Sequence, residues 1–203
     1  MRTKFKAWAE PYLHEHPEVM LSLDNIIDFD KPYYLEIGSG KGQFLVDMAK
    51  KFPEKFFVGV ERNVTCCGFT AKKLVEEEIQ NAKLMFIDAE VLTKALKDES
   101  IETIFLNFSD PWPKKKHHKR RLTAISYLNN YYRLLKHNGR LIMKTDNVDL
   151  FSFTLENINE TPFKVIYQTD NYMDYDEFDT MTEYEKSFRD EGIAIHRIIL
   201  EKL

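Results

Sequence analysis

The chain has 203 residues, of which 43% are hydrophobic, and a formal net charge of -4. This length predicts a substantial core and one domain over residues 1–203, with a short N-terminal extension over about residues 1–30. No apolar run approaches the roughly 18 residues that span a bilayer, and the start of the chain lacks an apolar signal-peptide core, so we expect a soluble, cytoplasmic protein.

Apolar segments with strand character alternate with amphipathic segments that have helical spacing. In chain order, the pattern predicts a strand at 33–38, a helix at 43–52, a strand at 56–61, a helix at 70–80, strands at 83–88 and 101–108, a helix at 122–136 that ends at Asn138-Gly139, a strand at 140–145, a helix at 150–158, and strands at 163–169 and 193–201. Such alternation is typical of an α/β fold with a mostly parallel sheet and helices on both faces. The adjacent cysteines Cys66 and Cys67 are expected to be reduced and structural.

Three of the seven glycines, Gly38, Gly40 and Gly42, lie where the first strand passes into the first helix. Glycine at such a point lets a ligand approach the backbone and the helix amides closely. A P-loop and a dinucleotide fingerprint both need glycine where this chain has Gln43, so neither pattern is met. The remaining pattern, G-x-G-x-G, is the form found in enzymes that use S-adenosylmethionine.

Acidic residues accompany the first three predicted strands. Glu36 lies within the first strand, Glu61 ends the second and Asp88 ends the third. Ligands of doubly wound sheets bind outside the carboxyl ends of the strands, where a carboxylate can accept ribose hydroxyls or an adenine amino group. Acids here suit a cationic sulfonium and would repel a pyrophosphate. The pattern therefore favours an adenosine ligand, S-adenosylmethionine over a nicotinamide cofactor, and we expect no metal.

A turn with the sequence "SDPWP" places Asp110 directly before a basic stretch, Lys114–Arg121. All eight residues of this stretch are Lys, Arg or His, although the whole chain is acidic. A second biased segment, 170–185, contains seven acids and no base. It is either a solvated loop or part of a site.

The segments "EIGSGKGQF", "NFSDPWPKKKHHKRRLT", "KTDN" and "MTEYE", in this order, resemble the bacterial tRNA (guanine-N7-)-methyltransferase family over nearly the whole chain. The resemblance implies a Rossmann-like class I methyltransferase fold, with a seven-stranded, mostly parallel sheet whose last strand is antiparallel. It implies methyl transfer from S-adenosylmethionine to N7 of a guanosine in the variable loop of tRNA. It leaves open whether the protein is a monomer or a homodimer.

The resemblance also assigns roles to individual positions. Asp110 matches the proposed catalytic position. The positions that match cofactor-binding residues are Glu36, Gly38, Gly40, Gly42, Glu61, Asp88 and Asp110. The positions that match substrate-binding residues are Lys114, Asp146, Thr182, Glu183, Tyr184 and Glu185. The positions that match RNA-contacting residues are Lys116, His117, His118, Lys119, Arg120 and Arg121.

The chemistry fits these roles. Neutralising RNA phosphates supplies much of the affinity for tRNA, so an acidic enzyme needs its cations gathered on one surface. Guanine N7 carries an unprotonated lone pair, so methylation needs alignment rather than a general base.

Trp112 either stacks on a base or is structural. Two alternatives stay open: a methyltransferase that acts on a base amino group, and a non-catalytic RNA-binding protein on a degenerate Rossmann-like fold.

Overall fold

The computed structural model describes residues 3–27, 31–173, 176 and 178–203. The chain folds into two compact units, Met1–Leu96 (unit 1) and Lys97–Leu203 (unit 2). The single domain predicted from the sequence, with its N-terminal extension, stays a prediction. No helix in the described ranges has the length and apolar character needed to cross a membrane.

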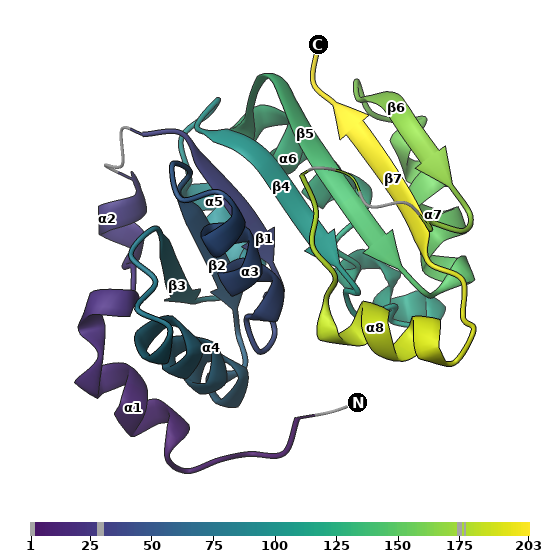
Figure 1. Cartoon of the computed structure of the whole chain (residues 1–203). Helices are drawn as coiled ribbons and strands as arrows, with labels where there is room; N and C mark the ends of the chain where they lie inside the picture. Colours follow the sequence, from purple (N-terminus) through teal and green to yellow (C-terminus); the bar gives the residue numbers. More distant parts are fainter. Residues whose placement is uncertain (1–2, 28–30, 174–175, 177) are drawn as a thin grey trace. The chain divides into compact units, whose positions relative to one another are not determined.

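Unit 1 is built on three parallel strands in the order β3-β2-β1. Its elements are α1 (Ala9–Glu15), the 3-10 helix η1 (Pro17–Val19), α2 (Leu23–Ile27), β1 (Tyr33–Ile37), α3 (Gln43–Lys51), β2 (Phe57–Glu61), α4 (Val64–Glu76), β3 (Ala82–Phe86) and α5 (Ala89–Ala95). Helices α3 and α4 cover one face of these strands (Figure 1). The parallel register sets Ile37 beside Val60 and Glu61 beside Phe86, so the carboxyl ends of the three strands meet at one edge.

The N-terminal segment packs onto α4. A Cβ built on Gly68 would lie 2.5 Å from the Ala9 Cβ and 2.8 Å from the Ala9 Cα, so only glycine lets α1 approach this closely. The ring of Trp8 meets Phe69 edge-on at 5.1 Å between centroids. Cys66 and Cys67 lie in the same helix, where both are free and buried, and burial raises the pKa of both thiols.

Unit 2 has four strands in the order β4-β5-β7-β6, and β7 runs antiparallel to both of its neighbours. Its elements are β4 (Ile101–Asn107), the 3-10 helix η2 (Lys115–Arg120), α6 (Ile125–Leu134), β5 (Leu135–Thr145), α7 (Val148–Ile158), β6 (Lys164–Thr169), α8 (Glu183–Asp190) and β7 (His196–Glu201). The antiparallel last strand confirms the prediction from the resemblance.

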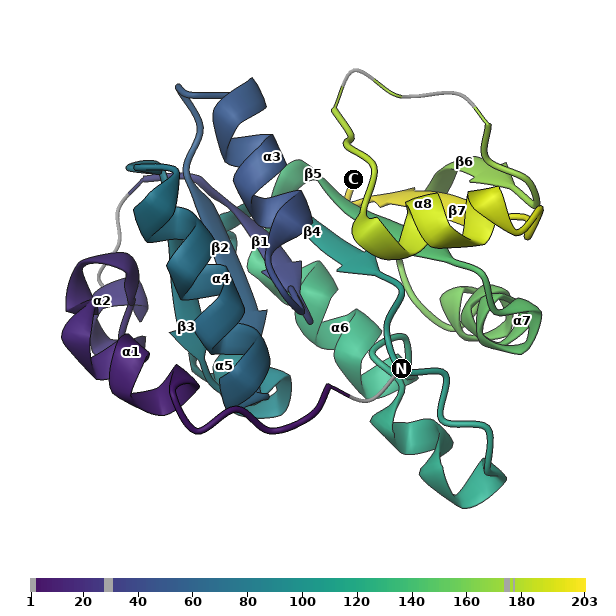
Figure 2. The same cartoon turned by 60° about the horizontal axis from the view of Figure 1, so that its bottom comes forward.

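Helices α7 and α8 lie on opposite faces of β5 (Figures 1 and 2). Successive side chains of a strand point to opposite faces. Met143 accepts a hydrogen bond from Thr154 of α7, whereas the next residue, Lys144, pairs with Glu185 of α8. This alternation gives unit 2 a helical layer on either side.

The predicted helix stop at Asn138-Gly139 is wrong. Helix α6 ends at Leu134, and both residues lie inside β5. Asn138 has φ +61° and its N–H donates to the Lys202 carbonyl, so the pair forms an irregularity within the strand. The same left-handed preference that ends helices also suits a strand bulge, and the local sequence does not distinguish them.

Further differences lie in the helices. Helix α4 begins at Val64 rather than 70, because the Asn63 side chain accepts from the Thr65 and Cys66 amides and caps the helix. The sequence pattern did not predict α1, η1, α2, α5, η2 or α8. These elements have eight residues or fewer, so they give little periodic signal.

Candidate functional site

The glycine loop lies at the carboxyl edge of the strands of unit 1. The N–H groups of Gly38 and Ser39 donate to the Val60 carbonyl at 2.8 and 3.0 Å, so the loop is fixed across the end of β2. Gly38 has φ +80° and Gly40 has φ +56°, and a Cβ built on either would meet nothing within 4 Å. The backbone at these two positions is therefore both left-handed and open to a ligand.

Gly42 has a different role. It has φ +76° and a Cβ here would lie 2.5 Å from Cγ2 of Thr70, on α4. Thr70 in turn donates from its hydroxyl to the Gly40 carbonyl at 3.0 Å. The absence of a side chain at Gly42 thus lets the start of α3 pack closely against α4.

Glu61 joins the loop to the end of β2. One carboxylate oxygen accepts from the Gly40 amide at 3.1 Å, and the other accepts from the amides of Arg62 and Asn63, both at 2.8 Å. These bonds hold the carboxylate at the edge in one orientation. A carboxylate has about four acceptor positions, so bonding to three amides leaves it able to accept a further hydroxyl.

The two other acids of unit 1 that the sequence predicts to bind the cofactor, Glu36 and Asp88, lie near the same edge. Glu36 is buried in β1, in register with Gly59. Asp88 follows β3 and caps α5, accepting from the Glu90 amide at 2.8 Å, and its other oxygen lies 3.7 Å from the Arg62 guanidinium. Open, left-handed glycines beside carboxylates fit the ribose and the cationic end of S-adenosylmethionine. No group of three or more potential metal ligands occurs in the part of the chain that the structure describes.

In unit 2, the turn that carries Asp110 follows β4 and is strained. Phe108 and Trp112, neither of them glycine, have φ +51° and +42°. Asp110 is exposed between them. Strained backbone of this kind is a common property of functional turns and persists only where neighbouring groups restrain it.

The basic stretch forms η2 directly after this turn. Lys114 precedes the helix and is exposed, as are Lys115, Lys116, Lys119 and Arg120, while His117 and His118 are half-buried. His117 stacks on the Trp112 ring at 5.8 Å, and the Arg120 guanidinium lies 5.1 Å from the same ring. Trp112 therefore joins the turn to η2, which favours its structural role.

Arg121 does not share the exposure of its neighbours. It is 3% exposed, and its Nε donates to the Pro111 carbonyl at 2.7 Å. The structure separates it from the remainder of the predicted RNA-contacting residues.

The predicted substrate segment, Thr182–Glu185, forms the start of α8. The Thr182 hydroxyl caps the helix by accepting from the Glu185 amide at 2.9 Å, while Glu183 and Tyr184 are exposed. Asp146 lies in the same unit, just after the end of β5. Phe188 of α8 packs on Phe108 with ring centroids 5.6 Å apart, so the helix also contacts the strained turn.

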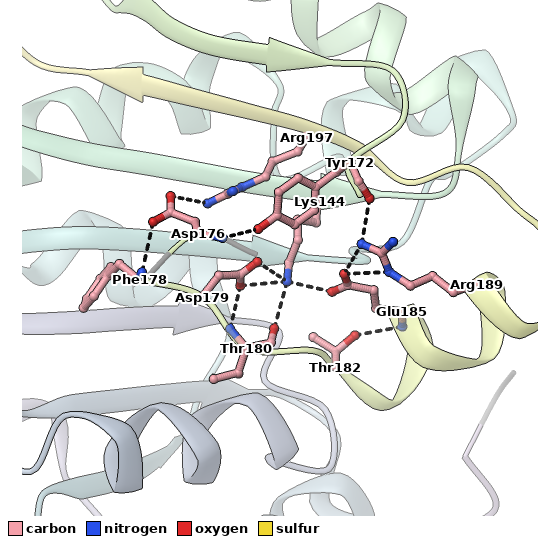
Figure 3. Close-up of polar contacts among 10 residues, drawn as sticks. All are labelled: Lys144, Tyr172, Asp176, Phe178, Asp179, Thr180, Thr182, Glu185, Arg189 and Arg197. Carbon is pink, nitrogen blue, oxygen red and sulfur yellow. Dashed lines mark hydrogen bonds and ion pairs between the residues drawn. The ribbon is translucent and has the colours of Figure 1, made fainter. Parts of the chain in front are cut away.

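A buried cluster of charges holds this segment in place (Figure 3). The Lys144 ammonium, 1% exposed, donates to Asp179 and Glu185, both at 2.8 Å, and to the Thr180 carbonyl at 3.0 Å. The second oxygen of Glu185 pairs with Arg189 at 2.8 Å, and the Glu185 residue is 0% exposed. In this conformation both oxygens of Glu185 face cations of the protein.

The acidic segment 170–185 is thus not a solvated loop in its described part. Asp176 pairs with the buried Arg197 of β7 at 2.9 Å, in addition to the two acids held by Lys144. Burial alone would raise the pKa of Asp176, but the Phe178 amide and Arg197 outweigh it, so the pKa lies below its ordinary value. Sequence reasoning missed Lys144, Arg189 and Arg197, because each looks like an ordinary surface cation along the chain.

Residues 30–198 match the model of a family described as "Putative methyltransferase". The tRNA (guanine-N(7)-)-methyltransferase of Limosilactobacillus reuteri (strain DSM 20016) is 38% identical, over 98% of each chain. That of Staphylococcus haemolyticus (strain JCSC1435) is 41% identical, over 98% of this chain and 96% of its own. The chain belongs to the tRNA (guanine-N(7)-)-methyltransferase family.

A solved structure of an antibiotic-related methyltransferase also matches this family member, with a TM-score of 0.66 and 16% identity, over 90% of this chain and 96% of its own. At that identity the likeness bears on the fold alone. It confirms the prediction of a Rossmann-like class I methyltransferase fold.

Proposed function

We propose that the protein transfers a methyl group from S-adenosylmethionine to N7 of a guanosine in the variable loop of tRNA. The observation that carries the proposal is the family membership over 98% of the chain, together with an intact glycine loop and its acids. In this proposal unit 1 holds the methyl donor and unit 2 holds the RNA. The protein would act in the cytoplasm, where tRNA is its partner.

Bound S-adenosylmethionine would supply an electrophilic methyl group on a cationic sulfur. The open backbone at Gly38 and Gly40 would admit its ribose and methionine portions, and Glu61 would accept from a ribose hydroxyl. Glu36 and Asp88 would complete the acidic surroundings at the strand ends. Acids at this edge favour a cationic ligand over a nucleotide with a pyrophosphate.

Asp110 would act on the acceptor. N7 attacks with its own lone pair, so the protein contributes alignment and a suitable electrostatic environment. Positive charge develops on the purine as the new bond forms, and an exposed carboxylate in a restrained turn can stabilise that charge. Lys114, Asp146 and the Thr182–Glu185 segment are the proposed contacts to the substrate. Because Glu185 is buried and paired, guanine would reach it only if the segment shifted.

The exposed cations of η2 would hold the RNA backbone. A-form RNA hides N7 in a narrow groove, so the target base must lie in a loop or be drawn out of its stack. Cations beside the Asp110 turn would bind the phosphates on either side of such a base. This placement explains why an acidic chain concentrates positive charge at one point.

Nucleoside analysis of tRNA after reaction with S-adenosylmethionine tests the proposal. We expect 7-methylguanosine at a single variable-loop position. A guanosine or adenosine methylated on its amino group would show the alternative chemistry. If calorimetry detected no cofactor binding while tRNA still bound, the protein would be an RNA-binding module instead.

A further inference from the structure

Arg121 belongs to the basic stretch by sequence but not by environment. Arg121 is 3% exposed, whereas the two residues before it, Lys119 and Arg120, are exposed. A side chain that neutralises a phosphate needs its guanidinium at the surface. Arg121 is thus poorly placed to contact RNA.

The contacts of Arg121 point toward the turn that carries Asp110. Its Nε donates to the carbonyl of Pro111, the residue after Asp110, at 2.7 Å. The guanidinium carbon lies 4.5 Å from the centre of the Phe153 ring, on α7. Burial lowers the pKa of Arg121, which Asp149 only partly offsets, yet an arginine stays charged at neutral pH. The charge therefore strengthens the bond to the Pro111 carbonyl.

The turn needs such an anchor. Phe108 and Trp112 each occupy a left-handed conformation that is unfavourable for residues other than glycine. One end is held by the Phe108 amide, which donates to the Lys144 carbonyl at 2.9 Å. The bond from Arg121 to Pro111 holds the turn beyond Asp110. Asp110 lies between these two anchored points, so both bonds restrain the backbone from which its side chain extends.

We propose that Arg121 is a positioning residue, which orients Asp110 by holding the Pro111 carbonyl, and is not a contact to RNA. This inference rests on the proposed function, since it assigns Asp110 a part in methyl transfer. It predicts that loss of Arg121 affects turnover, whereas loss of its exposed neighbours affects RNA affinity.

The test compares Arg121→Gln with Lys119→Gln, which removes one positive charge from an exposed position two residues away. For Arg121→Gln we expect kcat at saturating tRNA to fall on the order of 10- to 100-fold, as for a misplaced reacting group. The Kd for tRNA should stay within about twofold, and its salt dependence should match wild type. For Lys119→Gln we expect weaker tRNA binding and a slope of log K against log salt that is shallower by about 0.7–0.9.

Hydrogen exchange supplies a readout that does not depend on catalysis. Amides of the turn 108–114 should exchange faster in Arg121→Gln than in the wild type, and their exchange rates should be unchanged in Lys119→Gln. Both variants should retain the circular dichroism of the wild type. Arg121→Lys keeps a charged donor and should recover part of the lost kcat. If the Gln variant does not fold, Arg121→Lys carries the same comparison, with a smaller fall in kcat expected.

The outcomes are separable. A shallower salt slope and weaker tRNA binding in Arg121→Gln, with kcat intact, would show that Arg121 contacts RNA and overturn the inference. Unchanged kcat and unchanged exchange would overturn it as well. If the wild-type protein formed no 7-methylguanosine, the proposed function would fail, and exchange in the turn would still decide whether Arg121 holds Pro111.

Discussion

Glu61 has a structural part in the glycine loop beside its proposed contact to the ribose. Its carboxylate accepts from three backbone amides, one of them in the glycine loop, and so fixes the loop to the end of β2. The same bonds orient it at the edge where doubly wound sheets bind their ligands. A residue in this position cannot be replaced without changing both the loop and the proposed ribose contact.

Replacing Glu61 with Ala should weaken S-adenosylmethionine binding by about 1.5–3 kcal/mol, because a charge-assisted hydrogen bond to the ribose is lost. Binding of tRNA should change little. Calorimetry with each ligand measures both effects. Glu54→Ala, which removes an exposed acid in the turn before β2, is the matched control. Equal losses for the two ligands would point to a folding defect rather than a cofactor contact.

Asp110, unlike Glu61, is exposed in a strained turn, so its side chain contributes little to the stability of the core. Asp110→Ala should lower kcat by more than about tenfold, or roughly 1.4 kcal/mol in activation free energy, while the Kd for tRNA and the melting temperature stay near wild type. Turnover assays, RNA binding and thermal unfolding give the three quantities. Glu160→Ala removes an exposed acid elsewhere in unit 2 and should leave all three unchanged. Retention of more than a tenth of the wild-type kcat would remove Asp110 from the proposed mechanism.

At the scale of elements, β5 organises unit 2. Its Lys144 carbonyl anchors the turn after β4 through the Phe108 amide, and its Lys144 ammonium anchors the segment before α8 through Asp179 and Glu185. One residue thus restrains both the turn that carries Asp110 and the proposed substrate segment. A buried ion pair adds little net stability, but removal of one partner leaves the other charge buried alone.

We therefore expect Lys144→Met to lower the free energy of unfolding by about 3–5 kcal/mol, because Asp179 and Glu185 both lose the buried ammonium that pairs with them. Lys136→Met is the control on the same strand. Its pair with Glu102 is one-third exposed, so we expect a loss of about 0–1 kcal/mol. Urea denaturation of both variants provides the comparison. If both variants lost a similar, small free energy of unfolding, the cluster in Figure 3 would be more hydrated than its burial indicates.

For the whole molecule, charge distribution matters more than net charge. A chain of net charge -4 can bind polyanionic tRNA only through a local surface of opposite sign. In the proposed function the exposed part of the basic stretch would supply this surface, since its Lys and Arg side chains other than Arg121 face solvent.

Changing Lys115, Lys116 and Lys119 together to Gln should make the slope of log K against log salt shallower by about two to three, since each phosphate contact contributes about 0.7–0.9. Binding of tRNA at several salt concentrations measures the slope. The control changes Lys72, Lys97 and Lys164 to Gln, for the same change in net charge at dispersed sites. If both triple variants behave alike, tRNA responds to net charge rather than to this surface.

The sequence by itself determined the alternation of strands and helices, the glycine loop, the acids at the strand ends and the turn before the basic stretch. Those features are local, because hydrophobic period, glycine conformation and residue type act within a few positions. Only the tertiary structure decided that Arg121 is buried on Phe153, that Gly42 packs on Thr70 and that Lys144 pairs with Asp179 and Glu185. The partners of Lys144 lie 35 and 41 positions along the chain. A charged side chain in a strand looks exposed in sequence, and its burial depends on whether distant elements bring an opposite charge to it.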